Sequence, residues 1–392
     1  MKVPAPSLNI SWTLAGNVVY AASQWAMLVL IAKLGDAQMV GQFALGLAVV
    51  GPVMLFASLQ LRGVQATDAS GRYGFGHYLG LRLVTTGVAL LALLGPGVIG
   101  LIAVGKAFEG LGDVCFGAFQ QRERMDLIAK SMILKGVCSL VAMGCLLHAT
   151  HSLLWAVGGM TAVSAAVALG YDLRNARGLL GSIRPTFAWS LTQLAWRALP
   201  LGIVYLLTAL TANLPRYFIA HELGTAALGV FAALAYMTLV GGTVVNALGQ
   251  AASPRLARLH AAGSRDEFRQ ALAKLLAAGG AVGVAGWLIA VVAGPEVLAL
   301  AYRPEYAVQA PVLAWLMAAG ALGFIGSLLG YAMTALHAFK AQVPLTAAVA
   351  LATAAGCWML VPGHGLVGGA IALLLGAAVQ CAGGAWVVAR AS

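Results

Sequence analysis

The sequence predicts an all-α polytopic membrane protein with about 12 transmembrane helices, built as two six-helix lobes that are related by a parallel repeat. The composition is 61% hydrophobic and only 9% charged over 392 residues. Soluble domains are about 45–50% apolar and about 25% charged, so a soluble globular protein is excluded. The apolar residues gather in blocks close to the ~20 residues that a helix needs to cross a bilayer.

Twelve such blocks are expected as membrane spans. They cover residues 12–32, 40–59, 78–94, 98–120, 127–148, 152–170, 196–220, 226–249, 272–293, 309–333, 342–361 and 366–388. With a cytoplasmic N-terminus, nearly all loop lysines and arginines fall on the inner side, and the outer side keeps only Lys33 and Arg303. This follows the positive-inside rule. Both termini are therefore expected in the cytoplasm, and the net charge of +11 reflects topology and not a nucleic-acid partner.

The sequence carries no pattern typical of a cofactor, a metal site or catalysis. The five cysteines lie inside apolar blocks without paired spacing, as expected of packing residues; they are Cys115, Cys138, Cys145, Cys357 and Cys381. His148 and His151 have no third ligand nearby, and structural zinc needs four. No Walker motif is found, so we expect no ATP hydrolysis.

An internal repeat predicts the division into lobes. Residues 34–45 (LGDAQMVGQFAL) and 223–234 (LGTAALGVFAAL) both join the first and second spans of a six-span half, and Gln24 and Asn213 occupy matching polar positions before them. The expected domains are an N-terminal lobe at 1–171, a cytoplasmic inter-lobe linker at 172–195 and a C-terminal lobe at 196–392. Repeated lobes of this kind are typical of transporters, whose substrate site lies between the repeats.

Three charges interrupt the fourth apolar block. In KAFEGLGDVCFGAFQQRERM (106–125), Lys106, Glu109 and Asp113 follow one another at spacings of three and four, which places them on one helix face. Charges at this depth face a bundle interior or an aqueous cavity. Two interpretations remain open: the charges neutralise one another, with Lys135 as a further partner, or they form a cavity wall in which Glu109 or Asp113 carries a proton or cation.

Further polar residues within spans are candidates for the same cavity. Arg216 follows Pro215, which lacks a backbone N–H, so we expect a local helix break there. Its guanidinium can bind phosphate through two hydrogen bonds or extend to the outer headgroups. Asn17 and Gln24 lie two helical turns apart on one face, where they line a cavity or join neighbouring helices.

The inner segment 251–275, AASPRLARLHAAGSRDEFRQALAKL, alternates apolar and basic residues. This pattern fits a helix lying on the anionic inner leaflet and fits a cytoplasmic helical hairpin equally well.

Several segments resemble one family. They are NVVYAASQW (17–25), LGDAQMVGQFALGLAVVGPV (34–53), LQLRGVQATD (59–68), the charged stretch 106–125 and YRPEY (302–306). Together they resemble the bacterial polysaccharide flippases, which include the O-antigen lipid flippases, of the multidrug/oligosaccharidyl-lipid/polysaccharide (MOP) exporter superfamily. The resemblance covers the whole chain in layout, and its motifs are concentrated in the first 130 residues.

The resemblance implies a V-shaped, MATE-like pair of six-helix lobes in the bacterial inner (cytoplasmic) membrane. Such proteins move a lipid-linked oligosaccharide on a polyprenyl diphosphate from the inner to the outer leaflet, so the partners are that substrate, membrane lipids, a glycan polymerase and glycosyltransferases. It implies anion contacts for Lys106, Lys135 and Arg216, and capture at the inner mouth for Arg62 and Arg82. The candidate substrate-binding set is thus Lys106, Lys135, Arg216, Asn17, Gln24, Asn213, Arg62 and Arg82. Twelve spans instead of fourteen, and no arginine in the first span, favour an exopolysaccharide or O-antigen unit over lipid II.

Three alternatives remain. A drug/cation antiporter of the same superfamily would favour acidic groups in the membrane, whereas the spans here hold one more base than acid. A membrane glycan polymerase needs a sizeable outer domain, and the expected outer loops are too short for one, so no enzyme is expected. A major-facilitator carrier is the third, because DASGR (68–72) resembles part of that class's signature between the second and third spans.

Overall fold

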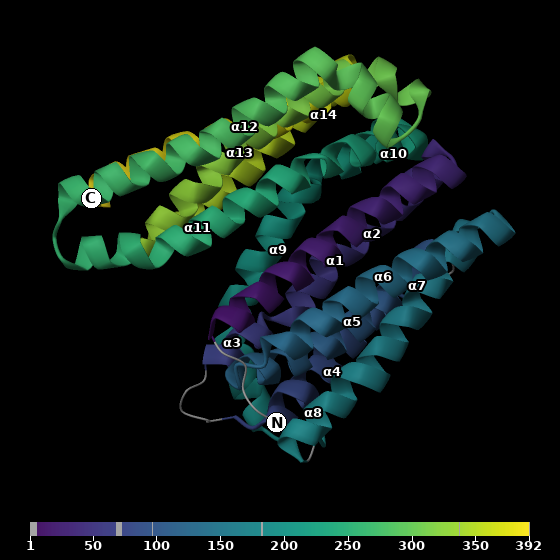
Figure 1. The fold of residues 1–392 in the computed structure, drawn as a ribbon, viewed down its shortest axis with the longest axis vertical. Coiled ribbons are helices and arrows are strands. Elements are labelled where there is room, and N and C mark those ends of the chain that lie inside the picture. The colour runs from purple at the N-terminus through teal and green to yellow at the C-terminus, as the bar shows by residue number, and fades with distance from the viewer. Residues whose placement is uncertain (1–5, 68–72, 96, 182, 337, 392) are drawn as a thin grey trace. The chain divides into compact units, whose positions relative to one another are not determined.

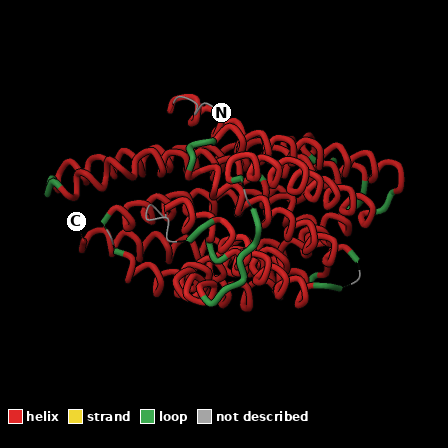
Figure 2. Tube along the Cα trace, turned by 90° about the horizontal axis from the view of Figure 1, so that it is seen from below, coloured by secondary structure: helices red, strands yellow, loops and turns green. Residues whose placement is uncertain are grey.

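The protein is almost entirely helical, as Figures 1 and 2 show. The computed structural model describes residues 6–67, 73–95, 97–181, 183–336 and 338–391; residues 1–5 and the DASGR segment lie outside them. Within these ranges no strand occurs, and nine helices are long and apolar enough to cross a membrane. The 24-residue helix that carries Lys106, Glu109 and Asp113 is not among the nine, because its charges lower its apolar content. The predicted all-α, multi-span membrane protein is confirmed.

The chain divides into two compact units, residues 1–209 and 210–392. The first holds α1 (Pro6–Leu34), α2 (Ala37–Ser58), α3 (Leu61–Thr67), α4 (Phe75–Leu93), α5 (Val98–Gln121), α6 (Met125–Thr150), α7 (Leu153–Val167), the π turn η1 (Ala168–Asp172), α8 (Leu173–Leu180) and most of α9 (Ser190–Glu222). The helix that starts at Leu153 continues through η1 to Leu180, so it extends into the segment expected as a linker.

The second unit holds the last turns of α9 and the remaining helices. These are α10 (Gly224–Tyr236), α11 (Thr238–Ala261), α12 (Arg265–Ala301), the 3₁₀ turn η2 (Pro304–Gln309), α13 (Ala310–Ala335) and α14 (Phe339–Ala391). α9 runs unbroken through Pro215, so the break expected beside Arg216 is wrong. A proline removes one backbone hydrogen bond, and helices in membrane proteins absorb this loss through neighbouring groups.

α14 contains two helices and not one. Gly365 has φ 56° and ψ −133°, a left-handed conformation that favours glycine because a Cβ would be strained there. On either side of it the chain folds back on itself: Gly356 lies against Ala372, and Gly376 against Thr353. This antiparallel pairing accounts for the last two expected spans.

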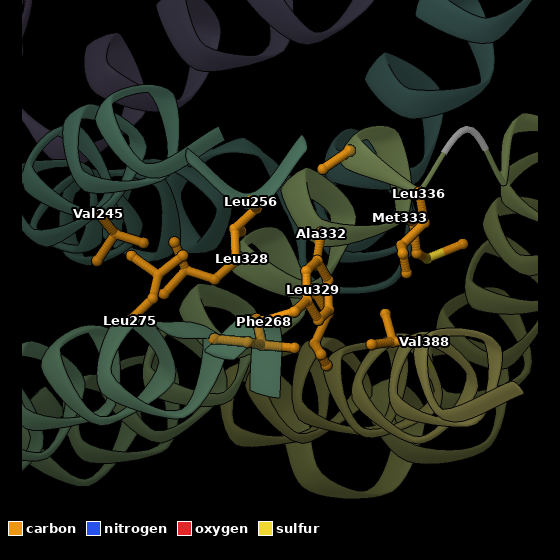
Figure 3. Packing of buried hydrophobic residues seen from close by; sticks show 12 residues of the cluster. Val245, Leu256, Phe268, Leu275, Leu328, Leu329, Ala332, Met333, Leu336 and Val388 are labelled. Carbon is orange, nitrogen blue, oxygen red and sulfur yellow. The ribbon is translucent and has the colours of Figure 1, made fainter. Parts of the chain in front are cut away.

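The segment between α11 and α12 is a helical hairpin. Its apolar side chains Leu256 and Phe268 are buried against Leu328 and Leu329 of α13, as Figure 3 shows. The basic side chains of this hairpin are all exposed: Arg255, Arg258, Arg265, Arg269 and Lys274. The alternating pattern thus reflects one face packed on a core and one exposed basic face.

Small residues bring α1 and α6 into close contact. The Gly16 backbone lies against Ala129, and Gly136 lies against Ser23. The two contacts follow each other in the same order along both helices, so α1 and α6 run parallel, as expected for the first and fifth spans of one lobe. Close packing at glycine is typical of helix pairs in membranes. It fixes the part of α6 that carries Lys135 beside the part of α1 that carries Tyr20.

Candidate functional site

A cavity of about 410 Å³ lies in the first unit. Residues of α1, α2, α3, α4, α5 and α6 line it, together with Gln60 from the turn between α2 and α3. Among the described residues its charged lining consists of Arg62, Arg82, Lys106, Lys135, Glu109 and Asp113. All six are residues that the sequence singled out. Four bases against two acids make this a net basic cavity with an apolar remainder that includes Tyr20, Met54 and Phe116.

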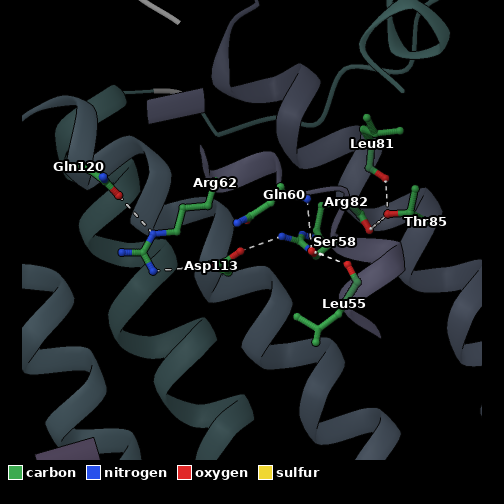
Figure 4. A network of polar contacts seen from close by, with 9 residues as sticks. All are labelled: Leu55, Ser58, Gln60, Arg62, Leu81, Arg82, Thr85, Asp113 and Gln120. Carbon is green, nitrogen blue, oxygen red and sulfur yellow. Dashed lines mark hydrogen bonds and ion pairs between the residues drawn. The ribbon is translucent and has the colours of Figure 1, made fainter. Parts of the chain in front are cut away.

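A strained turn between α2 and α3 supplies one wall. Leu59 and Gln60 have φ values of 46° and 51°, which is uncommon for residues other than glycine. Ser58 stabilises the turn, since its hydroxyl donates to the carbonyl of Leu55 at 2.7 Å and accepts from the Gln60 N–H at 3.3 Å. The chain resumes helix at Leu61, and Arg62 therefore points toward α5 (Figure 4).

Asp113 holds two arginines from different helices, as Figure 4 shows. Arg82 Nη2 donates to Asp113 Oδ2 at 2.9 Å, and Arg62 Nη1 lies 3.7 Å from Oδ1. Arg62 Nε also donates to Gln120 Oε1 at 3.3 Å. The Arg82 side chain is only 3% exposed, whereas Arg62 and Asp113 are each about one-third exposed. Asp113 thus fixes one buried cation and one cation that remains accessible from the cavity.

Lys106 and Glu109 form the second ion pair of α5. Lys106 Nζ donates to Glu109 Oε2 at 2.7 Å, one turn apart on the same helix. The two side chains are 28% and 23% exposed. The expected pairing of these two charges is therefore present, and both groups still line the cavity. A short, partly exposed pair of this kind can exchange one partner for a charged ligand.

Phe116 connects the two ends of the basic wall. The Arg62 guanidinium carbon and Lys135 Nζ each lie 5.4 Å from the centre of its ring. At this distance the ring quadrupole attracts a cation. The single aromatic side chain thus stabilises two cations from α3 and α6 at positions that would otherwise repel each other.

Sequence reasoning missed Asp172, the partner of Lys135. Asp172 ends the π turn η1, is fully buried, and has Oδ2 3.9 Å from Lys135 Nζ. The sequence predicts Asp172 at the start of a cytoplasmic linker, because the sixth apolar block ends before it. One signal could have found it: Lys135 has no acidic residue one turn away on its own helix, so a buried lysine there requires a carboxylate from another helix.

Four predicted residues are not brought to this cavity. Asn17 is exposed and donates to the carbonyl of Thr13 in its own helix at 2.7 Å, and Gln24 lies on the same helix outside the lining. Arg216 and Asn213 belong to the second unit, where Arg216 Nη1 donates to Asn213 Oδ1 at 3.0 Å. Arg216 also lies 5.9 Å from the centre of the Tyr236 ring.

The turn from α5 into α6 is fixed by a separate ion pair. Arg124 donates from Nε and Nη2 to the two carboxylate oxygens of Asp126, at 2.8 Å each. These hydrogen bonds raise the pKa of Arg124 above its usual value, because they favour the charged guanidinium. The pair thus orders the first turn of α6.

A multi-span helical protein with a net basic cavity inside one helical unit has the features of a membrane transporter. No family model matches the chain. It is 23% identical over 380 residues to the capsular polysaccharide biosynthesis protein CapF of Staphylococcus aureus, covering 94% of this chain and 95% of that one.

Two solved structures are similar over nearly the whole chain. One is an inward-facing multidrug resistance MATE family transporter of the MOP superfamily, with a TM-score of 0.78 and 13% identity over 97% of this chain and 98% of that one. The other is the lipid II flippase MurJ in an inward closed conformation, with a TM-score of 0.72 and 11% identity over 97% and 90% of the two chains. The chain shares its fold with both of these structures, and the fold expected from the resemblance in the sequence is confirmed.

Proposed function

We propose that this protein flips a lipid-linked oligosaccharide, carried on a polyprenyl diphosphate, from the inner to the outer leaflet of the bacterial inner membrane. The observation that carries the proposal is the net positive charge of the cavity lining, which has four bases against two acids among its described residues. A diphosphate headgroup needs cations that can leave their present partners. The relative in capsular polysaccharide biosynthesis and the likeness in fold to a lipid II flippase support the same substrate class.

The cavity offers different contacts to the diphosphate and to the sugars. Arg62, Lys106 and Lys135 are the accessible or cavity-lining cations that would bind the diphosphate oxygens. Arg82 is buried behind Asp113 and would act by holding that carboxylate in place. Sugar hydroxyls would find hydrogen-bonding groups at Ser58 and Gln60 on the strained turn, and the lipid tail would remain in the bilayer.

Transport would proceed by alternating access of two six-helix lobes, residues 1–171 and 196–392, joined by a cytoplasmic linker at 172–195. In such transporters one repeat rocks against the other around the binding site. Asn213 and Arg216 would meet the same substrate from the second lobe, and Asn17 and Gln24 would line its path along α1. No covalent bond is made or broken in this cycle, so we propose a transporter and not an enzyme.

Both termini are proposed to be cytoplasmic, as the basic loops indicate. A substrate built on the inner leaflet and extended on the outer one also implies protein partners. Glycosyltransferases would supply the lipid-linked unit, and a glycan polymerase would consume it.

A drug/cation antiporter is the second candidate, because a multidrug resistance transporter shares the fold. The two candidates differ in the charge of their cargo. The excess of bases in the cavity favours an anion.

The test uses the full-length protein in proteoliposomes with two cargoes, a fluorescent polyprenyl diphosphate sugar and a cationic dye. We expect movement of the lipid and not of the dye. Lys106→Gln is expected to slow the lipid, and Lys274→Gln, on the exposed hairpin, serves as the matched control of equal charge change. Movement of the dye without the lipid would support the antiporter instead.

A further inference from the structure

Asp172 is more deeply buried than the two carboxylates that line the cavity, Glu109 and Asp113. Its side chain is 0% exposed, and neither carboxylate oxygen accepts a hydrogen bond from the described residues. Its ion pair with Lys135 spans 3.9 Å, which is longer than a direct hydrogen bond. The residue ends a π turn, a local irregularity that is frequent at functional sites.

The backbone of α5 is shaped to leave room for this pair. A Cβ on Gly112 would lie 2.6 Å from Asp172 Oδ2 and 3.3 Å from Lys135 Nζ, so any larger residue would displace one of the two groups. Gly112 lies on α5 between Glu109 and Asp113. The same stretch of α5 therefore bounds the cavity and makes space for the buried pair.

Lys135 belongs to both environments. It lines the cavity and lies over Phe116, and it is also the ion-pair partner of Asp172. An anion that binds Lys135 from the cavity would draw the ammonium away from Asp172. The carboxylate would then be a buried charge without compensation, which is strongly unfavourable. A buried acid in that position resolves the problem by taking up a proton.

We infer that Asp172 is a proton-binding site coupled to occupation of the cavity through Lys135. This inference rests on the proposed function, since the diphosphate is the anion that takes Lys135. One proton from water adds to a carboxylate oxygen of Asp172 as the anion binds, and the same proton leaves when the anion is released and the ion pair re-forms. Anion and proton are therefore bound together, with about one proton per anion.

Among the described residues, no second base that could replace Lys135 lies next to Asp172. α6 contributes Lys135 and the hydroxyl of Ser131, α5 contributes the thiol of Cys115, and Tyr171 is the neighbour on its own turn. α7 carries no ionisable residue. The two arginines of α8, Arg174 and Arg177, are exposed.

Asp113 and Glu109, the carboxylates that the sequence suggested for ion coupling, are placed differently. Asp113 is 32% exposed and is held by two arginines, one of which, Arg82, is buried. Glu109 is 23% exposed and lines the cavity itself. When a ligand enters, water or a remaining cation can compensate the negative charge of either carboxylate. Neither carboxylate is therefore forced to take up a proton.

The experiment measures proton uptake as a ligand binds to purified full-length protein. A polyprenyl diphosphate is added in weakly buffered detergent solution, a pH indicator records proton exchange, and bound ligand is measured in parallel. We expect about one proton taken up per bound ligand in the native protein. We expect this uptake to vanish in Asp172→Asn while binding persists. Glu222→Gln is the matched control, a carboxylate-to-amide change at an exposed residue outside the cavity lining that should retain the uptake per bound ligand.

The outcomes separate this inference from the proposed function. Absence of diphosphate binding to the native protein would count against the proposed function. Binding without proton uptake in the native protein would overturn the inference, and this result does not depend on whether any variant folds. Equal uptake in the native protein and in folded Asp172→Asn would also overturn it, because the proton would then go elsewhere.

Discussion

The Arg82 side chain is only 3% exposed and donates a 2.9 Å hydrogen bond to Asp113, which lies at the edge of the cavity. The two residues come from α4 and α5, so one ion pair joins two helices and orients a carboxylate toward a third, α3. Removal of Asp113 would therefore leave a buried guanidinium without its counter-ion.

We expect Asp113→Asn to lower the free energy of unfolding by about 2–3 kcal/mol, less than a fully buried pair would lose because Asp113 is partly exposed. Thermal unfolding in detergent measures the change. Glu222→Gln is the control: Glu222 pairs with an exposed His221, and its loss should change stability by less than about 0.5 kcal/mol. Equal effects of the two substitutions would show that the Arg82 pair adds nothing to stability.

Lys106→Gln should reduce transport of the sugar lipid about tenfold or more, because a hydrogen bond between charged groups contributes about 1.5–3 kcal/mol. The expression level and the melting temperature should change little, since the Lys106–Glu109 pair is partly exposed and lies at the cavity surface. Initial rates in proteoliposomes test this. Unchanged transport rates at unchanged expression would mean that Lys106 and Glu109 only neutralise each other and do not bind the substrate.

Arg216→Ala should impair transport even though Arg216 lies outside the cavity of the first unit. Its guanidinium is held by Asn213 at 3.0 Å and by the Tyr236 ring, an arrangement that orients a cation without neutralising it. Arg216→Lys retains the charge but loses the planar fork, so we expect it to recover only part of the rate. Full activity of Arg216→Ala in the same assay would restrict its role to structure.

Gly112→Ala should destabilise the protein by about 1–3 kcal/mol, because a methyl group would overlap the buried Asp172–Lys135 pair. Gly178→Ala provides the comparison, since a Cβ there meets no atom and alanine favours the helix by about 0.5–1 kcal/mol. Denaturant titration of both variants measures the change in the free energy of unfolding, which should fall for Gly112→Ala and rise for Gly178→Ala. A neutral Gly112→Ala would mean that the ion pair can move without loss.

The parts of the structure that the sequence predicted are those governed by burial in the bilayer. The last two expected spans, for example, are an antiparallel hairpin around Gly365. The charged cavity was predictable for the same reason: charges on α5 must meet other charges or a cavity, and α5 indeed meets Arg62, Arg82 and Lys135 there.

What could not be predicted depended on the exact end of a helix or on the packing between helices. Asp172 was placed outside the membrane because an apolar block ended before it, whereas the helix continues as a π turn. Asn17 and Gln24 share a helix face, but which neighbour covers that face is decided by the α1–α6 contact at Gly16 and Gly136. Pro215 predicts a break in α9, but the helix continues through it without interruption.

The unloaded cavity contains its own counter-ions. Asp113 and Glu109 lie in the cavity next to its cations, and the buried Asp172 holds Lys135 from behind the lining, so the four bases have three carboxylates as partners when no ligand is bound. A carrier must also return empty across the low-dielectric bilayer, where an uncompensated charge is costly. With its carboxylates back on its cations, the empty form would make that return with little more than one net charge exposed to the membrane field.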